Sequence, residues 1–429
     1  MIHDERFDRD LGGMLADLAE PRFPDYFNEA LQRAMAHRQR PAWTFPERWF
    51  PMGVLARRLP LVPALPARMV GILMMLMLLL VATVVIGVGA LLLQQRPAPQ
   101  FGLAANGDFA YTQDGDIYAA MHDGSQARLV IGGPTLDVAP SYSRDGQSLY
   151  FIRVVSESPD VVEVMVANAD GSGVRALTEP EETSGIHWWT ISPRGDVMAM
   201  VNDSVSPRFS IISLDDGTRT ALDLPNAIQV DQHEWLPSGE EIVLVGRNAA
   251  GWAGIFAVAT DGTGLRTIVE PQARTYVLSF SISDDGRHLA YGAFHDDSGR
   301  LGVWHLVDLA TGLDTVQLAP AGQHQLGPVF SSDSSHVAFV RYSDERDGRI
   351  DAQVFVAPID DLAAPVAVGP RQRIPSGTGG LYPQFSPDAA GMVITSDDGH
   401  AWLADLPTGE YDELPFGNET GVSWQRRAP

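Results

Sequence analysis

Aromatic, imidazole, amide and carboxylate side chains gather at matching places in three segments of this sequence. Each of these segments is followed by a tight-turn motif and then by an apolar run. The residues at these places are His187, Trp188, Gln232, His233, Glu234, Tyr382 and Gln384. Side chains of these types bind small polar molecules or peptides when they line a cavity. We therefore expect them to line the mouth of a central channel.

The alternative interpretation is that the same side chains only pack. Trp189 and Trp235 would then lie between neighbouring sheets, while His187 and His233 would bond to loop carbonyls. Packing is favoured, because interfaces between sheets readily take up aromatic side chains.

Signatures of catalysis and of metal binding are absent from the sequence. It has no Cys, no G-x-S-x-G motif, no H-E-x-x-H motif and no pair of His residues at metal-ligand spacing. The Asp-rich turns lack the pattern of a calcium loop that ends in Glu. The sequence thus predicts no catalytic residues, no metal and no cofactor, and hence a protein that is not an enzyme.

One short sequence motif recurs along the chain, and the elements that it forms must position these residues. It reads PSYSRDGQSLYFIR at 140–153, TISPRGDVMAMV at 190–201 and SISDDGRHLAYG at 281–292. A large apolar residue precedes a turn, and a strand follows it. Gly in such turns tolerates positive φ, and Asp bonds to the nearby backbone. The equivalent positions are Ser143, Ser192, Leu236, Ser283, Ser331 and Ser386.

The intervals between these positions, 44 to 55 residues, match the four-stranded blades of β-propellers. Residues 421–425 read like the first strand of a further repeat, and residues 108–131 supply three strands that lack a first one. The sequence therefore predicts an all-β, seven-bladed propeller closed by its C-terminal strand. Six or eight blades stay open as alternatives, because Val368–Leu381 reads as a long insertion.

The motifs SPRG, SDDG and SPDAAG, with ADGSG and TDGTG between later strands, resemble those of the TolB-like and WD-like family of bacterial propellers with PD-type repeats. The resemblance covers residues 101–429. It implies a propeller that binds or scaffolds other molecules outside the cytoplasm. The third and fifth copies, LPSG and SSDSS, depart from the pattern at their blade boundaries.

A long apolar segment precedes the propeller. Residues 69–93 carry no charge and would form a helix of about 37 Å, long enough to cross a bilayer core of about 30 Å. Arginines are concentrated before this segment, and the chain after it is strongly acidic. The positive-inside rule then predicts a single-pass protein of the cell membrane, with a cytoplasmic N-terminus and an extracytoplasmic propeller.

The segment before residue 69 divides into two parts. Residues 1–50 contain apolar residues at helical spacing and predict a small α-helical cytoplasmic segment. Residues 51–68 are rich in Pro and Arg and predict an extended juxtamembrane linker. This layout resembles membrane-tethered anti-sigma factors, which implies a cytoplasmic sigma factor as partner. An anchor without a partner is the alternative.

Of the formal net charge of −24, residues 1–96 contribute +2 and the remainder −26, and this acidic part disfavours binding of nucleic acid. The sequence therefore predicts a membrane-anchored propeller that binds or senses an unidentified extracytoplasmic protein, peptide or small ligand. Two alternatives stay open. One is a transmembrane regulator similar to an anti-sigma factor, and the other is a propeller hydrolase or lyase with its site in the central channel.

Overall fold

The structure is a computed structural model of the chain. It describes residues 75–81, 83, 97–157, 160–182, 188–201, 209–222, 224, 228–294, 302–343, 348–375, 380–417 and 421–429. The chain divides into two compact units, Met1–Val85 and Ile86–Pro429, and each is described by itself.

Of the first unit, the structure describes one short helical stretch. Residues 75–81 and 83 are helical, and their side chains are exposed. The predicted segments 1–50 and 51–68, and the rest of the apolar segment 69–93, lie outside the described residues. Among the helices that the structure does describe, none has both the length and the apolar character needed to cross a membrane.

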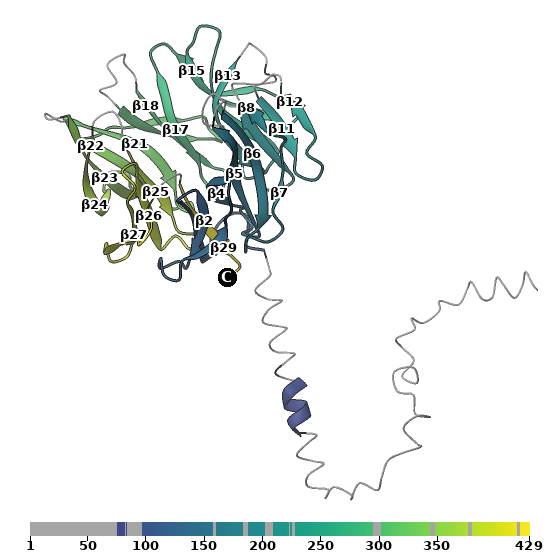
Figure 1. The fold of residues 1–429 in the computed structure, drawn as a ribbon. Helices are drawn as coiled ribbons and strands as arrows, with labels where there is room; N and C mark the ends of the chain where they lie inside the picture. Colours follow the sequence, from purple (N-terminus) through teal and green to yellow (C-terminus); the bar gives the residue numbers. More distant parts are fainter. Residues whose placement is uncertain are drawn as a thin grey trace, which may run out of the picture. The chain divides into compact units, whose positions relative to one another are not determined.

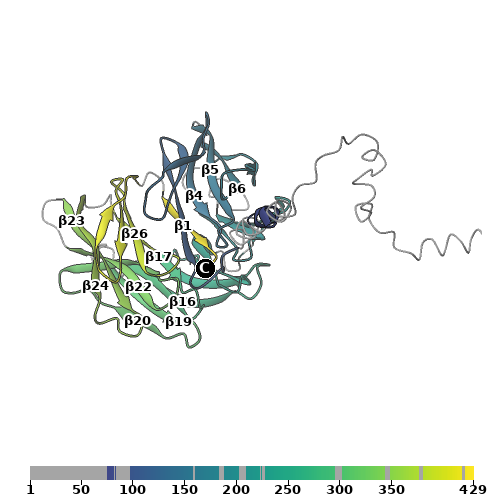
Figure 2. The ribbon, with the colours of Figure 1, turned by 90° about the horizontal axis from the view of Figure 1, so that it is seen from below.

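The described residues of the second unit form six four-stranded sheets and one five-stranded sheet, which are the seven blades of a propeller (Figures 1 and 2). In hydrogen-bonded order, blade 1 consists of β29 (Val422–Arg427), β1 (Ala105–Gln113), β2 (Asp116–Ala120) and β3 (Arg128–Ile131). Blade 2 consists of β4 (Leu136–Tyr142), β5 (Ser148–Glu157), β6 (Asp160–Asn168) and β7 (Arg175–Ala176), and β8 (Glu181–Glu182) also pairs with β6. Blade 3 consists of β9 (Trp188–Ile191), β10 (Val197–Val201), β11 (Phe209–Ser213) and β12 (Arg219–Ala221), and blade 4 consists of β13 (Gln229–Trp235), β14 (Glu241–Arg247), β15 (Ala253–Ala259) and β16 (Arg266–Gln272).

The other three are blade 5, β17 (Tyr276–Ile282), β18 (His288–Phe294), β19 (Gly302–Asp308) and β20 (Asp314–Gln317); blade 6, β21 (Gln323–Phe330), β22 (His336–Ser343), β23 (Arg349–Pro358) and β24 (Val366–Pro375); and blade 7, β25 (Leu381–Phe385), β26 (Gly391–Ser396), β27 (Ala401–Asp405) and β28 (Tyr411–Glu413). The prediction of seven blades is confirmed, and the six- and eight-bladed alternatives are wrong.

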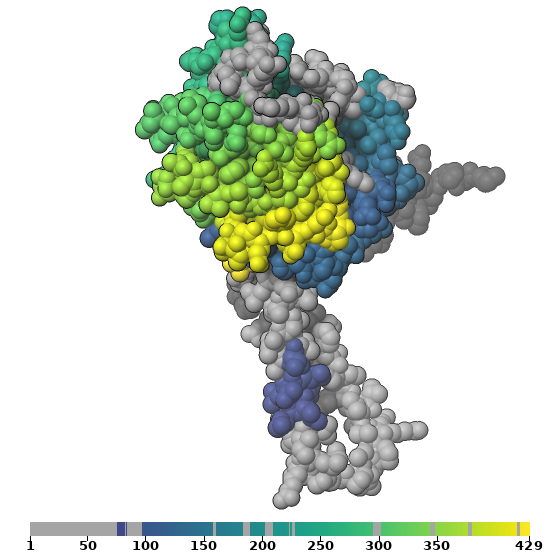
Figure 3. Space-filling view, turned by 90° about the vertical axis from the view of Figure 1, so that its left-hand side faces the viewer, coloured from purple at the N-terminus to yellow at the C-terminus, as the bar shows by residue number. Residues whose placement is uncertain are grey.

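The C-terminal strand closes the ring, as the sequence predicts. β29 pairs antiparallel with β1, with Trp424 opposite Phe109 and Val422 opposite Tyr111. Figure 3 shows this yellow C-terminal part against the blue blade 1. Blade 1 is thus assembled from both ends of the propeller sequence.

The segment Val368–Leu381, read as an insertion, adds no blade. Most of it belongs to β24, which pairs with β23 as far as Pro375 opposite Arg349. The extra residues therefore lengthen the outer hairpin of blade 6, which explains the widest interval between repeats.

The repeated turn is built in the same way in several blades. In blade 2, the hydroxyl of Ser143 donates to Asp145 Oδ1 at 2.6 Å and accepts from the backbone N–H of Ser148 at 2.9 Å. Gly146 follows with a φ of 71°. The fifth copy makes the same turn, with Ser334 at a φ of 59° in place of Gly. The departure in that copy therefore does not shift its blade boundary.

Candidate functional site

The ends of the first strands surround a pocket of about 440 Å³. Its lining comes from five blades, and the turn of a sixth adds Ser332. The lining residues that directly precede the large apolar residue of each repeat are Ser141, Thr190, Glu234, Gln384 and Ser423. Four of these side chains are neutral and polar. Glu234 therefore contributes the single ionisable group of this set.

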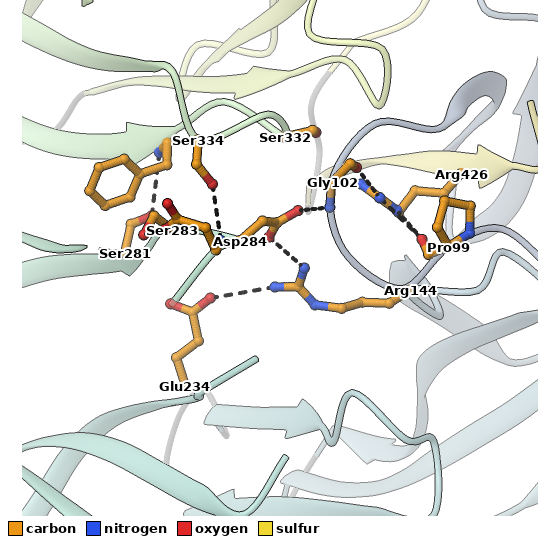
Figure 4. Close-up of polar contacts among 12 residues, drawn as sticks. Pro99, Gly102, Arg144, Glu234, Ser281, Ser283, Asp284, Ser332, Ser334 and Arg426 are labelled. Atoms are coloured by element: carbon orange, nitrogen blue, oxygen red, sulfur yellow. Dashed lines mark hydrogen bonds and ion pairs between the residues drawn. The ribbon is translucent and has the colours of Figure 1, made fainter. Parts of the chain in front are cut away.

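A charged cluster from three blades lies beside Glu234 (Figure 4). Arg144, in the turn of blade 2, places Nη1 3.0 Å from Asp284 Oδ1 in the turn of blade 5. Its Nη2 lies 3.8 Å from Glu234 Oε1 of blade 4. Because blades 2 and 5 are not neighbours in the ring, the Arg144–Asp284 ion pair spans the end of the channel at which the turns lie.

Residues 98–104, here called the strap, cross the same end of the molecule before β1 begins. Ala98 N donates to Asp145 O of blade 2 at 2.9 Å, and Ala104 N donates to Pro387 O of blade 7 at 2.9 Å. Between these two attachments, Gly102 N donates to Asp284 Oδ2 at 3.1 Å. The strap therefore contacts the same carboxylate that pairs with Arg144.

Two arginines hold the middle of the strap. Arg426, on the closing strand β29, donates to the carbonyl oxygens of Pro99 and Gly102. The guanidinium of Arg144 lies 4.5 Å from the centre of the Phe101 ring, a distance at which cation–π attraction operates. Both arginines also line the pocket. The pocket and the strap consequently share Arg144 and Arg426.

The channel environment changes the acidity of Glu234. Loss of solvation raises its pKa to about 7, an effect that the nearby Arg144 opposes and the carboxylate of Asp284 reinforces. An ionisable group with a pKa near 7 in a pocket is typical of binding and catalytic sites.

Substituting Glu234 is expected to change how stability depends on pH. Between the unfolded pKa of 4.5 and the folded pKa of about 7, the folded state holds more protons than the unfolded state, so stability falls as pH rises through this interval. Glu234→Gln removes this loss. Because one pKa unit corresponds to about 1.4 kcal/mol, the rise from 4.5 to about 7 amounts to about 3 kcal/mol, and the variant is expected to be more stable than the parent by about that much at pH 8. Urea unfolding from pH 4.5 to 8 measures this. Parallel pH curves for parent and variant would contradict it.

The structure separates the residues predicted to line one channel mouth. Glu234 and Gln384 line the pocket. Gln232 lies nearer the start of β13 and donates through Nε2 to Leu278 O at 2.7 Å. Tyr382 lies near the start of β25, half exposed, with its hydroxyl 2.9 Å from Asp397 Oδ2.

His233 is buried between blades 3 and 4 instead of facing the channel. Its Nε2 lies 3.0 Å from Ala199 O, its ring packs near Phe209, and burial lowers its pKa to about 4. Trp235 is likewise buried, with Nε1 donating to Thr190 O at 3.2 Å. His233 thus contacts a strand carbonyl, not a loop carbonyl, and Trp235 also lines the pocket. His187 and the side chain of Trp188 lie outside the described residues.

Arg144, Asp284 and Arg426 were missed at the sequence level. All three occupy the position that follows the Ser of the turn motif, or its equivalent, where three other copies carry Pro. The signal was therefore present: SRDG and SDDG place a charge where SPRG, LPSG and SPDA do not. No group of three or more His, Asp or Glu residues in the described part of the chain is arranged to hold a metal ion.

No family model and no curated protein sequence matches this chain. Solved structures do match. An oligogalacturonate lyase in complex with manganese is 12% identical over 74% of this chain and 86% of that chain, with a TM-score of 0.53. A puromycin-hydrolyzing peptidase of Mycobacterium tuberculosis is 13% identical over 76% of this chain and 51% of that chain, with a TM-score of 0.51. At these identities the likeness shows a common fold alone.

A putative TolB from Agrobacterium tumefaciens also matches, with 18% identity over 60% of this chain and 94% of that chain and a TM-score of 0.42. The propeller expected from the TolB-like resemblance is present in the structure, while the family itself is not shown.

The expectation that this protein is not an enzyme is corrected by the comparisons. The solved structures that match it include a lyase and a peptidase. The absence of G-x-S-x-G and H-E-x-x-H motifs therefore does not exclude catalysis on this fold.

Proposed function

We propose that this chain is a ligand-sensing propeller that binds a zwitterionic molecule, an amino acid or a short peptide, in its channel pocket. The observation that carries the proposal is the placement of Glu234 Oε1 3.8 Å from Arg144 Nη2 on the pocket wall. A ligand ammonium group matches the carboxylate, and a ligand carboxylate matches the guanidinium. Hydroxyl and amide side chains around them supply further hydrogen bonds.

Binding in this pocket would reach the strap through the shared ion pair. A ligand carboxylate on Arg144 competes with Asp284, which also accepts the hydrogen bond from Gly102 of the strap. The chain that precedes the strap leads to the apolar segment 69–93. We propose that this segment anchors the propeller outside the cell membrane. Release of the strap would then change the conformation of the chain that leads back to residues 1–50. A sigma factor as partner of residues 1–50 stays a prediction.

The test uses the full-length chain, whose lack of Cys permits a single dye at Leu103→Cys, an exposed strap position. Titration with the twenty free amino acids at pH 8 is expected to yield at least one that changes dye fluorescence. Its affinity is expected to fall at least tenfold in Glu234→Gln, since the ion pair with the ammonium is lost. Amidation of the ligand carboxylate is expected to weaken binding similarly.

Glu410→Gln, on an exposed loop, serves as the charge-matched control and is expected to bind like the parent. A dye response that is equal in parent and Glu234→Gln, or a lack of response to all twenty amino acids at 10 mM, would overturn the proposal. The strap is tested separately with Asp284→Asn, in which binding measured by calorimetry is expected to persist without the dye signal.

Catalysis in the same pocket is the second candidate. The observation that favours it is the pKa of Glu234 near 7, because an acid–base catalyst works best with a pKa near the working pH. Product formation decides between binding and turnover. It is measured in the samples from the titration and in the same protein incubated with short peptides and with oligogalacturonate. Products that form with the parent and disappear with Glu234→Gln would make this a hydrolase or lyase.

A further inference from the structure

A second cavity, of about 700 Å³, lies between blades 5 and 6 and shares no residue with the channel pocket. β19, β20, β21 and β22 contribute to its walls, together with residues that follow β23. Most of the lining is apolar, and the apolar lining residues include Trp304, Leu318, Phe339, Leu362 and Pro365. Two charged side chains also line it, Arg341 of β22 and Asp360, which follows β23.

Arg341 lies against aromatic rings instead of a carboxylate. Its guanidinium carbon is 4.2 Å from the centre of the Phe355 ring and 5.6 Å from that of Phe339. Among the described residues no Asp or Glu forms an ion pair with it, and its Nε is buried without a hydrogen-bond partner. Burial lowers its pKa, and no neighbouring charge opposes this effect.

Other arginines of the ring differ in this respect. Arg153 donates to both carboxylate oxygens of the buried Asp137 at 2.7 and 2.8 Å. Arg371, close to Arg341 in blade 6, pairs with Asp351 at 2.7 Å. Because partly buried charges in proteins are normally paired, the state of Arg341 indicates an anionic acceptor that the described residues do not supply.

A buried glutamine holds Arg341 in place. Gln325 of β21 donates through Nε2 to Gln317 O at 2.7 Å, which turns its Oε1 towards Arg341 Nη2 at 3.3 Å. The guanidinium also lies over the Phe355 ring, which limits its movement. The donor group is therefore positioned before any ligand arrives, which lowers the entropy cost of binding.

We propose that this cavity binds a small organic carboxylate with an apolar body. The carboxylate would accept hydrogen bonds from the guanidinium of Arg341, the side chain best suited to planar oxygen pairs. The apolar body would lie against Trp304, Leu318 and Leu362. This site is independent of the function proposed for the channel pocket.

The test compares hexanoate with hexanamide, which has the same chain length without the charge, by isothermal titration calorimetry on the full-length protein. Hexanoate is expected to bind at least tenfold more tightly than hexanamide. Arg341→Gln is expected to lower the affinity for hexanoate at least tenfold and to leave hexanamide unchanged. Arg266→Gln removes an arginine paired with Glu241 on the surface, and as the matched control it is expected to bind like the parent.

Equal binding of the two compounds, or unchanged binding of hexanoate to Arg341→Gln, would overturn this proposal. A melting curve shows whether each variant is folded. If Arg341→Gln does not fold, Arg341→Lys decides instead, because it keeps the charge but loses the planar pair of donors. It is expected to retain the preference for hexanoate at reduced affinity, and parent-like affinity would contradict the role of the guanidinium.

Discussion

Replacing Trp424 by Ala is expected to lower the free energy of unfolding by about 4 kcal/mol, in the range for large buried aromatic residues. Trp424 lies on the closing strand β29 and is buried between blades 1 and 7. Its ring is 4.5 Å from that of Phe109, and Nε1 donates to Gly107 O at 3.3 Å. Truncation leaves a cavity at the point where the ring closes. Urea titration followed by circular dichroism measures the loss.

The matched control is Tyr411→Ala on the outer strand β28, where the side chain is 47% exposed. A change of about 0.5 kcal/mol or less is expected there. Deleting residues 421–429 removes the whole first strand of blade 1 and is expected to abolish cooperative unfolding. If the shortened chain melts like the parent, closure by β29 does not stabilise the ring.

Replacing Gly146 by Ala is expected to cost about 3 kcal/mol of stability. Gly146 has a φ of 71°, where a side chain costs about 1–2 kcal/mol, and a Cβ there would lie 1.8 Å from the carbonyl oxygen of Arg426. Relief of this clash requires a shift of backbone in the closing strand, which adds about 1–3 kcal/mol. The free energy of unfolding from urea titration measures the sum.

Gly195 provides the comparison within the same protein. It occupies the same turn position in blade 3 with a φ of 68°, and a Cβ there would meet nothing within 4 Å. Gly195→Ala is expected to cost about 1–2 kcal/mol, from backbone conformation alone. Equal losses for the two variants would show that the contact between the blade 2 turn and β29 contributes nothing.

The fold could be predicted because its determinants are local in the sequence. The Ser–Asp–Gly turn and the strands on either side repeat at blade spacing, so each blade is specified by its own residues. Closure was predictable because residues 421–425 match the first strand of a blade that has no later strands after it, and residues 108–131 match the later strands of a blade that has no first strand before them. The β23–β24 hairpin was harder to predict. A long outer strand and an insertion have similar sequences, and only the pairing partner of the strand distinguishes them.

The site was only partly predictable, for a geometric reason. Successive residues of a strand point to opposite faces, so Glu234 reaches the pocket while His233 packs between blades. The two residues are adjacent in the sequence, and which face each side chain takes depends on the register of β13, which the sequence does not give. Arg144 and Asp284 meet across the ring although 140 residues separate them. No local sequence pattern indicates that these two residues form an ion pair.

The assembly of blade 1 from both ends of the ring has a consequence for synthesis. At about 5–20 residues per second, roughly 15–60 s pass between translation of β1 and of β29. During this interval β1 exposes an unpaired edge of N–H and C=O groups, which attracts other strands. A holdase that shields this edge on the nascent chain would therefore raise the yield of native protein. It would have to stay bound until β29 has left the ribosome.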